Sequence, residues 1–490
     1  MKINPMLLTD FYKISHRIMS EKGTEKIYST FTPRGSRIED IDSIVFFGLQ
    51  GFIKDYLIDY FNENFFNREK NEVISEYKRI ITYTLGINCA DSTHIEELYD
   101  LGYLPIKIKA VKEGTIVPMR IPVFTIENTK KRFYWLTNFL ETFISACLWK
   151  VTTATTITKK YRDICEKWAS KTADSKAHIQ WQCHNFSYRG MSGNEDAITT
   201  GAGHLLFFTG TDTIPSIQYL EHYYNANVEK ELVGASVLAT EHSIQCQYQD
   251  DFKYYTRMLT EVAQEGIISI VSDGYDYWNV IGNIIPRLKP IITSRNGKLV
   301  VRPDSGDPVK IICGDSDATN ILIKKGSIES LWDIFGGTIN SKGYKVLDPH
   351  IGLIYGDAIT LERAEEIFRQ LEIKGFSSEN IVFGVGSYSL GYHTRDTFSF
   401  ALKATYTIID GKEVNIFKDP VTDLDKIKKS QTGLVVVLQS DNSLILIDSL
   451  NEVGRDNYKD TDLLEDVFVD GELLRDEKFV DIRNRLLGNL

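Results

Sequence analysis

Apolar runs of strand length alternate with helix-like segments through the middle of the chain. The runs span residues 178–183, 205–208, 235–239, 267–271, 299–301, 351–355 and 381–383. Each run ends in polar residues, and apolar positions at helical spacing follow it. This alternation is typical of a parallel sheet, and seven such units close into a barrel more easily than they remain an open sheet.

Capping residues and apolar spacing predict several helices. Thr360 is placed to cap a helix whose apolar residues recur on one face, and Gly375 is placed to end it. Ser192 and Glu195 have the spacing of a capping box. Helical spacing also predicts helices over residues 133–168 and 44–61.

The flanking segments have a different pattern. Residues 26–32 and 104–126 alternate as strands do, and three hairpins are predicted near the C-terminus, around Asp410-Gly411, Asp441-Asn442 and Asp470-Gly471. We therefore predict an α/β protein with an irregular seven-stranded (β/α) barrel over residues 146–390. A discontinuous α+β domain of antiparallel sheet flanks it, built from residues 1–145 and 391–490.

Composition narrows the class of protein. The 490 residues are 42% hydrophobic and carry a net charge of −11, which disfavours nucleic acid as a partner. The six cysteines are scattered without a C-x-x-C pair, so we expect reduced thiols. With neither a signal peptide nor an apolar run of membrane-spanning length, we expect a cytoplasmic protein that does not enter membranes.

Polar residues follow the predicted strands, at the end of the barrel where such folds carry out chemistry. Arginine forks and backbone N–H groups bind phosphate, and carboxylates suit ribose hydroxyls or Mg²⁺. The candidates are Arg189, Arg302, Asp212, Asp273, Asp304, Asp357, His242, Gly356, Gly384 and Gly386. The loop after residue 301, Arg302-Pro303-Asp304-Ser305-Gly306, concentrates both kinds of group.

Several of these residues have two interpretations. His242, beside Glu241, is either a hydrogen-bonded structural residue or a base or phosphoryl acceptor. Asp212 is either a helix cap or a site carboxylate, and Phe186 is either a core residue or a platform for a flat ring. No lysine ends a strand, which disfavours a Schiff-base aldolase, and H-E-x-x-H and G-x-S-x-G are absent.

Taken in order, the motifs resemble those of the nicotinamide phosphoribosyltransferase family, from the first ten residues to the C-terminal hairpins. The matching stretches are Thr9-Asp10-Phe11-Tyr12-Lys13, Asn185-Phe186-Ser187-Tyr188-Arg189-Gly190, Gly210-Thr211-Asp212-Thr213, Glu241-His242-Ser243, Val271-Ser272-Asp273, Arg302-Pro303-Asp304-Ser305-Gly306, Gly356-Asp357, Thr394-Arg395-Asp396 and Phe417-Lys418-Asp419-Pro420. The resemblance implies a type II phosphoribosyltransferase. Such an enzyme joins nicotinamide to phosphoribosyl pyrophosphate with Mg²⁺, as a homodimer with shared active sites.

The resemblance also implies roles for individual residues. Phe186 and the partner subunit's Tyr12 would sandwich the pyridine ring, and Asp212 would accept from the carboxamide. The remaining implied substrate contacts are Arg189 and Arg302 for the diphosphate and the ring end; Asp304, Gly356 and Asp357 for the ribose; Gly386, Ser387 and the partner's Arg395 for the 5′-phosphate; Asp273 within a matched motif; and Arg34, Lys403 and Lys418 for positive charge across the interface.

Two further expectations come from the resemblance. His242 matches the histidine that the family phosphorylates with ATP as co-substrate. Catalysis would be electrostatic, with Asp304 and Asp357 stabilising an oxocarbenium-like sugar. The chain departs from the family in its glycine run, which reads Gly384-Val385-Gly386-Ser387-Tyr388. The bulky Tyr388 is expected to alter the shape of this phosphate loop.

Three other functions stay open at this point. A nicotinate phosphoribosyltransferase is related, but the charge of Asp212 argues against it. A phosphosugar isomerase or lyase on an α/β barrel would need a catalytic Lys or Glu at a strand end. A non-catalytic binding protein would have no need of His242, Asp304 and Arg302 together.

Overall fold

The computed structural model describes residues 3–356, 358–419, 422, 429–441 and 443–488. Its contacts divide the chain into two compact units. The sheet unit comprises Met1–Thr156, Leu220–Ala226 and His393–Leu490, and the barrel unit comprises Ile157–Tyr219 and Asn227–Tyr392. Asp357, Pro420 and Asn442, which belong to predicted motifs or turns, lie outside the described residues.

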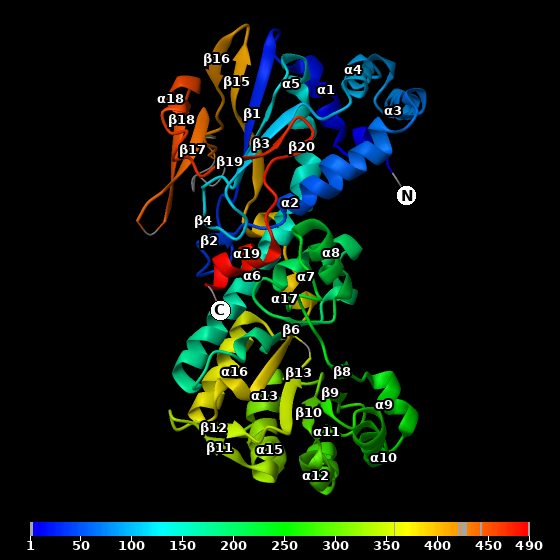
Figure 1. Ribbon diagram of the computed structural model, residues 1–490, viewed down its shortest axis with the longest axis vertical. Helices are drawn as coiled ribbons and strands as arrows, with labels where there is room; N and C mark the ends of the chain where they lie inside the picture. The colour runs from blue at the N-terminus through cyan, green and yellow to red at the C-terminus, as the bar shows by residue number, and fades with distance from the viewer. Residues whose placement is uncertain (1–2, 357, 420–421, 423–428, 442, 489–490) are drawn as a thin grey trace. The chain divides into compact units, whose positions relative to one another are not determined.

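The barrel unit is built on a curled sheet of seven parallel strands (Figure 1). In spatial order these are β7 (Gly210–Thr211), β6 (Cys183–Asn185), β14 (Ile381–Val385), β13 (Ile351–Tyr355), β10 (Gly297–Arg302), β9 (Gly266–Val271) and β8 (Leu238–Ala239). A parallel bridge from Gly210 to Ala235, just before β8, links one edge of the sheet to the segment that leads into the other. The predicted α/β fold class is confirmed.

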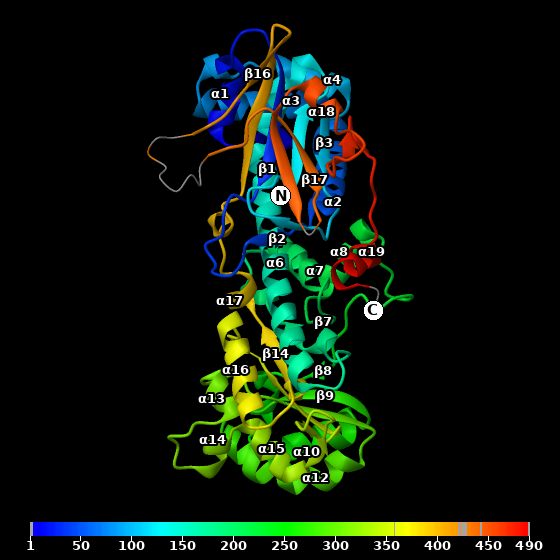
Figure 2. The same cartoon turned by 90° about the vertical axis from the view of Figure 1, so that its left-hand side faces the viewer.

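Helices surround this sheet, and all of them except α6 (Glu141–Thr172), which precedes its first strand, come after a strand along the chain (Figures 1 and 2). They include α6, α7 (Asn194–His204), α8 (Ile214–Tyr224), α9 (His242–Tyr248), α10 (Asp251–Arg257), α12 (Ile285–Ser294), α13 (Pro308–Cys313), α15 (Ser327–Phe335), α16 (Leu361–Ile373) and α17 (Ser387–Leu390). The predicted cap of α16 is confirmed, because the Thr360 side chain accepts a hydrogen bond from the Arg363 backbone N–H.

Four local predictions were wrong, at least in part. The predicted strand at residues 178–183 is mostly a 3₁₀ turn (Ile179–Trp181), and β6 begins only at Cys183. Residues 205–208 do not form a strand: they follow the C-terminus of α7, and β7 begins at Gly210. Ser192 and Glu195 form no capping box, because Gly193 is the N-cap and Asp196 accepts from the Ser192 N–H. The predicted helix at residues 44–61 begins instead as strand β2 (Ser43–Val45), which pairs with β4 (Ile116–Pro118) before helix α2 (Leu49–Phe52).

The sheet unit contains a second seven-stranded sheet, in which every neighbouring pair is antiparallel. Its order is β16 (Lys412–Asn415), β15 (Ala401–Ile409), β1 (Thr24–Thr32), β5 (Phe124–Asn128), β3 (Ile106–Ala110), β19 (Glu465–Val469) and β20 (Glu472–Leu473). The predicted hairpins at Asp410-Gly411 and Asp470-Gly471 are confirmed. All four turn residues have positive φ, as tight hairpin turns require.

Helices and a hairpin cover the two faces of this sheet (Figures 1 and 2). On one side lie α1 (Phe11–Met19), α3 (Lys70–Thr84), α4 (Thr93–Leu101) and α5 (Tyr134–Phe139). On the other lie β17 (Leu434–Gln439), β18 (Leu444–Leu450) and α18 (Glu452–Asp456). No helix among the described residues is long and apolar enough to cross a membrane.

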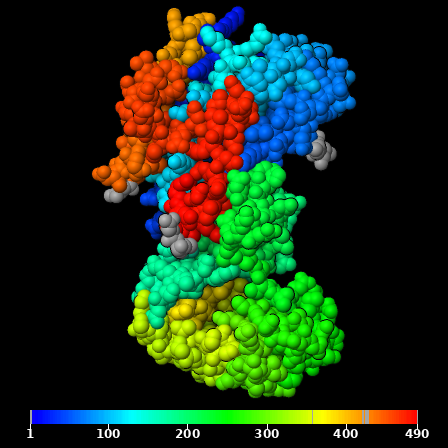
Figure 3. Space-filling view, viewed as in Figure 1, coloured from blue at the N-terminus to red at the C-terminus, as the bar shows by residue number. Residues whose placement is uncertain are grey.

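A buried glutamate, Glu113, joins separate segments of the sheet unit. Glu113 accepts hydrogen bonds from the backbone N–H groups of Gly48 (3.0 Å) and Gln50 (2.6 Å) and from the Tyr224 hydroxyl (2.9 Å). Its own N–H donates to Glu477 at 3.0 Å, just before helix α19 (Phe479–Leu487). Figure 3 shows this red C-terminal segment packed against the blue N-terminal segment of the same unit.

Candidate active site

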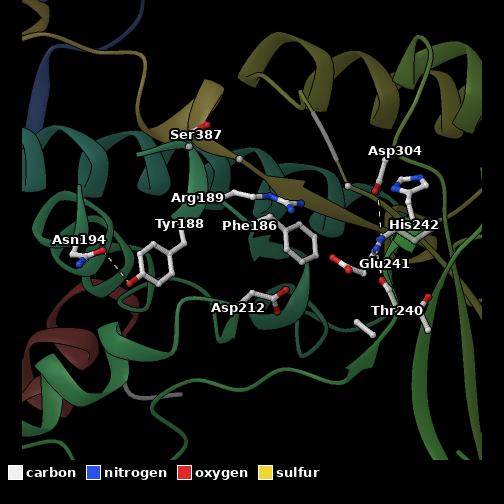
Figure 4. A pocket seen from close by; sticks show the side chains of 15 residues that line it. Phe186, Tyr188, Arg189, Asn194, Asp212, Thr240, Glu241, His242, Asp304 and Ser387 are labelled. Atoms are coloured by element: carbon white, nitrogen blue, oxygen red, sulfur yellow. Dashed lines mark hydrogen bonds and ion pairs between the residues drawn. The ribbon is translucent and has the colours of Figure 1, made fainter. Parts of the chain in front are cut away.

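A pocket of about 850 Å³ opens at the carboxyl ends of the parallel strands. Residues that follow six of the seven strands line it, which is the geometry that strand-end chemistry requires. Its walls include Phe186, Arg189, Asp212, His242, Arg302, Asp304, Gly356, Gly386 and Ser387. In the view of Figure 4, Phe186, Arg189 and Asp212 lie toward one side, and Glu241, His242 and Asp304 toward the other.

Arg302 is the last residue of β10, and Asp304 lies in the loop that follows it. The Arg302 Nη2 donates to the Thr240 carbonyl at 2.5 Å, and its Nε lies 3.5 Å from Asp304 Oδ1. A Cβ at Gly356 would lie 2.0 Å from Asp304 Oδ1, so glycine must follow β13 for the carboxylate to take this place. The pair therefore presents one positive and one negative group side by side at the pocket wall.

Asp273 lies behind that wall. Its side chain is 4% exposed, and Oδ2 accepts from the Asp304 N–H (2.9 Å), the Ser305 N–H (2.8 Å) and the Ser305 hydroxyl (2.5 Å). Its Oδ1 lies 3.0 Å from Nε2 of His242. Burial raises the pKa of Asp273, but the hydrogen bonds from Ser305, Asp304 and His242 outweigh burial and lower it. Asp273 thus ties the His242 imidazole to the Arg302 loop.

The ends of β6 and β14 pack directly on each other. The Phe186 N–H donates to the Val385 carbonyl at 3.0 Å. A Cβ at Gly190 would lie 2.0 Å from Ser387 Oγ, so glycine permits this approach. Ser387 begins α17 with Gly386 as its N-cap. Tyr388, the departure noted in the sequence, is 58% exposed and its ring stacks on that of Tyr392 at 5.5 Å.

The carboxylate of Asp212 is held from one side only. Oδ1 lies 2.7 Å from Nε2 of His184 and accepts from the Ser236 hydroxyl at 2.8 Å. Burial raises the pKa of Asp212, but the hydrogen bond and charge of His184, the Ser236 bond and the charge of Arg302 outweigh burial and lower it. Asp212 is therefore an ionised carboxylate at neutral pH.

His184 was not predicted as a site residue. Its ring lies against that of Phe186, with centroids 4.5 Å apart and planes 35° apart. The signal was present in the sequence, because residues two apart in a strand share a face. A second, mainly apolar cavity of about 310 Å³ shares Phe186 and Asp212 with the pocket and continues among barrel residues such as Val300 and Ile354.

The other predicted residues belong to the sheet unit. Tyr12 is 56% exposed. Partial burial and the charges of Glu141 and Asp10 raise the pKa of its hydroxyl. The charges of Lys403 and Arg395 oppose this shift, so both cations lie near the Tyr12 ring. Lys403 donates to Glu141 at 3.0 Å. The remaining two residues are Arg34, whose Nε donates to the Ser399 carbonyl at 2.9 Å, and Lys418, whose backbone pairs with Ser430.

The described residues contain no group of three or more His, Cys, Asp and Glu side chains arranged to hold a metal ion. Asp357 lies outside the described residues, so the structure tests no role for it. The pocket thus combines an aromatic face with an ionised carboxylate at one side and an arginine–carboxylate pair with a histidine at the other.

Comparisons with known proteins agree with this fold. The family model described as "Nicotinate phosphoribosyltransferase (NAPRTase) family" matches residues 181–472, and that of "Nicotinamide phosphoribosyltransferase, N-terminal domain" matches residues 4–108. The chain is 47% identical to the nicotinamide phosphoribosyltransferase of Acinetobacter baylyi, covering 100% of this chain and 98% of that one. It is 30% identical to that of Xanthomonas campestris pv. campestris, covering 98% and 97%.

Solved structures share the fold at low sequence identity. A nicotinate-nucleotide pyrophosphorylase from Pyrococcus furiosus superposes with a TM-score of 0.58 at 15% identity, over 99% of this chain and 95% of that one. Human nicotinic acid phosphoribosyltransferase gives 0.55 at 11% identity, over 98% and 93%. The chain therefore belongs to the nicotinate phosphoribosyltransferase family of pentosyltransferases, alongside relatives named nicotinamide phosphoribosyltransferase.

Proposed function

We propose that the barrel pocket joins nicotinamide to 5-phosphoribosyl 1-diphosphate, giving nicotinamide mononucleotide and diphosphate for NAD biosynthesis. The names of the relatives that match the whole chain support this reaction. The observation that carries it is the ionised Asp212 beside Phe186, because this pair suits a flat ring that bears a hydrogen-bond donor.

Asp212 selects the amide over the acid in this proposal. Its carboxylate accepts a hydrogen bond from the carboxamide NH₂ of nicotinamide. The carboxylate of nicotinate has no such donor, and its negative charge is repelled by Asp212. The lowered pKa of Asp212 keeps the selecting charge present at neutral pH.

The other polar groups at the strand ends handle the sugar phosphate. Arg302 and Arg189 take the diphosphate, Asp304, Gly356 and Asp357 take the ribose, and Gly386 with Ser387 takes the 5′-phosphate. As the C–O bond to diphosphate breaks, positive charge develops on the sugar and negative charge on the leaving group. Fixed charges of the opposite sign, Asp304 for the sugar and Arg302 for the diphosphate, stabilise both without a covalent intermediate.

His242 is the phosphoryl acceptor that couples the reaction to ATP. A ring nitrogen attacks the γ-phosphorus, the bond to ADP breaks, and water later releases phosphate from the histidine. Its exposed position in the pocket and its contact with Asp273 support this role: the side chain is 48% exposed, so a phosphate group has room.

Mg²⁺ fits this pocket as the companion of the diphosphate. Carboxylate oxygens are its preferred protein ligands, and Asp304 presents such a group beside Arg302. When bound, the ion neutralises charge on the departing diphosphate. Chelation of divalent ions with EDTA is expected to abolish synthesis, and added Mg²⁺ to restore it.

A homodimer completes the site. Tyr12, Arg395 and Lys403 form an exposed cluster of one aromatic ring and two cations in the sheet unit, which suits the open face of a pyridine ring and a phosphate. We propose that the sheet unit of one subunit supplies this cluster, with Arg34 and Lys418, to the pocket of its partner.

The direct test is product identification. Purified protein is incubated with 5-phosphoribosyl 1-diphosphate, Mg²⁺ and either nicotinamide or nicotinate, with and without ATP, and the mononucleotide is identified by mass spectrometry. We expect nicotinamide mononucleotide, formed faster with ATP. Nicotinate mononucleotide as the main product, or none, would contradict the proposal, and ADP release surviving His242→Ala would contradict the phosphohistidine.

A further inference from the structure

His184 touches both side chains to which the proposed function assigns the pyridine ring. Its Nε2 lies 2.7 Å from Asp212 Oδ1, and its ring lies against the Phe186 ring at a centroid distance of 4.5 Å. The side chain is 12% exposed, so it stands behind these two groups. A single imidazole thus supports the hydrogen-bond acceptor and the stacking face together.

Hydrogen bonds to only one of its two oxygens orient the carboxylate of Asp212. His184 and Ser236 both bind Oδ1, and no hydrogen bond from another described residue reaches Oδ2. Two bonds on one oxygen fix the side-chain torsion and direct the other oxygen away from the bonded pair. Since Asp212 lines the pocket, Oδ2 is the oxygen available to a ligand.

Gly210 makes room for this imidazole. A Cβ at position 210 would lie 2.8 Å from Nδ1 of His184, closer than real Cβ contacts allow. Gly210 lies in β7 and pairs with His184 of the neighbouring strand β6. The neighbouring strand therefore supplies a glycine where the histidine ring passes, and the ring is held between β7 and Asp212.

We propose that His184 is a positioning residue for pyridine specificity: it holds Oδ1 of Asp212, so that Oδ2 meets the carboxamide, and it backs the Phe186 ring. This inference rests on the proposed function, in which Asp212 selects the amide. Without His184 the carboxylate rotates and its charge is no longer fixed toward the ring's substituent, so nicotinate is rejected less strongly.

Electrostatics support the same role. The groups that act on Asp212 include His184, Ser236 and Arg302, and the hydrogen bond from His184 does most to lower the pKa of Asp212 against the effect of burial. Removal of that bond raises the pKa of Asp212. As a result, nicotinamide binding is expected to weaken at a higher pH on acidification than it does in the wild type. A variant that merely contains less folded protein would not show this shift in pH dependence.

Three variants separate the contributions. His184→Phe keeps a planar ring but loses the N–H, His184→Gln restores a donor near the position of Nε2, and Ser236→Ala removes the second bond from an exposed side chain. Loss of a hydrogen bond to a charged group is expected to raise KM for nicotinamide about tenfold in His184→Phe, with kcat little changed.

The readout is the ratio of kcat/KM for nicotinamide to that for nicotinate. We expect this ratio to fall about tenfold in His184→Phe, about threefold in Ser236→Ala, and to return to within about threefold of the wild-type ratio in His184→Gln. The acid limb of the nicotinamide KM profile is expected to shift to higher pH in His184→Phe.

Asp212→Asn tells two kinds of failure apart. If Asp212→Asn changes the ratio and neither His184→Phe nor Ser236→Ala does, the positioning role of His184 is wrong while the proposed function stands. If Asp212→Asn leaves the ratio unchanged, Asp212 does not select the amide, and this inference falls with it. If His184→Phe does not fold, an unchanged ratio in Ser236→Ala alone contradicts the orientation of Asp212 by bonds to Oδ1.

Discussion

The molecule contains two seven-stranded sheets that use their polar residues in different ways. In the seven-stranded sheet of the barrel unit all neighbouring strands are parallel, so their carboxyl ends meet at one edge and the residues after them converge on one pocket. In the sheet unit all neighbouring strands are antiparallel, so strand ends alternate between edges. There the buried Glu113 is occupied by packing bonds.

The same contrast appears at the two ends of β10. Before the strand, the Arg295 guanidinium donates to the Ala263 carbonyl at 2.9 and 2.6 Å and to the Gly266 carbonyl at 3.1 Å. At the other end of the strand, Arg302 donates one hydrogen bond to the Thr240 carbonyl and lines the pocket. Position along a parallel strand, more than residue type, separates an arginine that is held by backbone carbonyls from one that lines the pocket.

The largest effect is expected for Arg302→Ala. Loss of a fixed positive charge facing the departing diphosphate lowers kcat/KM by about 10²–10³-fold. Arg295→Ala is the matched control at the other end of the strand; it is expected to lower Tm but to leave kcat/KM of the folded enzyme within about threefold. Equal losses of activity in both variants would remove the distinction between the two ends.

Gly356→Ala is expected to have the next largest effect. Its Cβ would lie 2.0 Å from Asp304 Oδ1, so the carboxylate must move. Displacement of a group by about 1 Å costs about 10²-fold in rate. Gly352→Ala, within β13, serves as control, because its Cβ would lie no closer than 3.3 Å to the flexible Lys298 side chain and 3.7 Å to Val300. Steady-state kinetics test this difference: a large loss of kcat/KM in Gly356→Ala but not in Gly352→Ala supports it, and similar values in both variants contradict it.

Mixing subunits tests what the sheet unit contributes to catalysis. Equal amounts of inactive Arg395→Ala and Asp304→Ala chains are expected to recover about a quarter of wild-type activity, because half the dimers hold one intact site. The assay follows mononucleotide formation after mixing under conditions that allow exchange. Activity that stays at the level of the single variants would show that Arg395 and Asp304 act within one chain.

The smallest effect on catalysis is expected for Glu113→Gln. This substitution changes how the stability of the fold depends on pH. Burial raises the pKa of Glu113 from 4.5 to about 7. The folded state therefore binds the proton more tightly, and this contribution to stability is complete below pH 4.5 and lost as pH rises through about 7. Tm of the wild type is expected to fall over this range more than that of Glu113→Gln.

Exposed Glu69 provides the control for that measurement. Glu69 belongs to the same unit, and Glu69→Gln is expected to leave the pH dependence of Tm unchanged. Parallel Tm curves for the wild type and Glu113→Gln between pH 4.5 and 8 would show that Glu113 does not titrate as its burial implies. kcat/KM at 25 °C is expected to stay within about twofold in both variants.

Sequence predicted the parts of the fold that depend on local pattern. The strand at residues 351–355, the cap at Thr360 and the turns at Asp410-Gly411 and Asp470-Gly471 follow from periodicity and turn chemistry. The run at 205–208 failed, because four apolar residues fit a buried helix end as well as a strand. The capping box failed because Asp196 reached the Ser192 N–H.

The site was predictable as a set of residues but not as an arrangement. Strand-end position selected Arg302, Asp304, Asp212 and His242, which the barrel unit brings to one pocket. Pattern alone did not reveal that Asp273 stands behind the pocket wall, since its partners come from two other loops. For His184 the pattern indicated only a face shared with Phe186; its contact with Asp212 joins neighbouring strands and could not be predicted from spacing.

The central claim is that the barrel pocket selects nicotinamide through the charge of Asp212. An equimolar mixture of nicotinamide and nicotinate, supplied with 5-phosphoribosyl 1-diphosphate, Mg²⁺ and ATP, tests it most directly when the mononucleotides made by the wild type and Asp212→Asn are compared. We predict almost only nicotinamide mononucleotide from the wild type, and a nicotinate share raised about tenfold or more in Asp212→Asn. The same product ratio from both proteins would contradict the account.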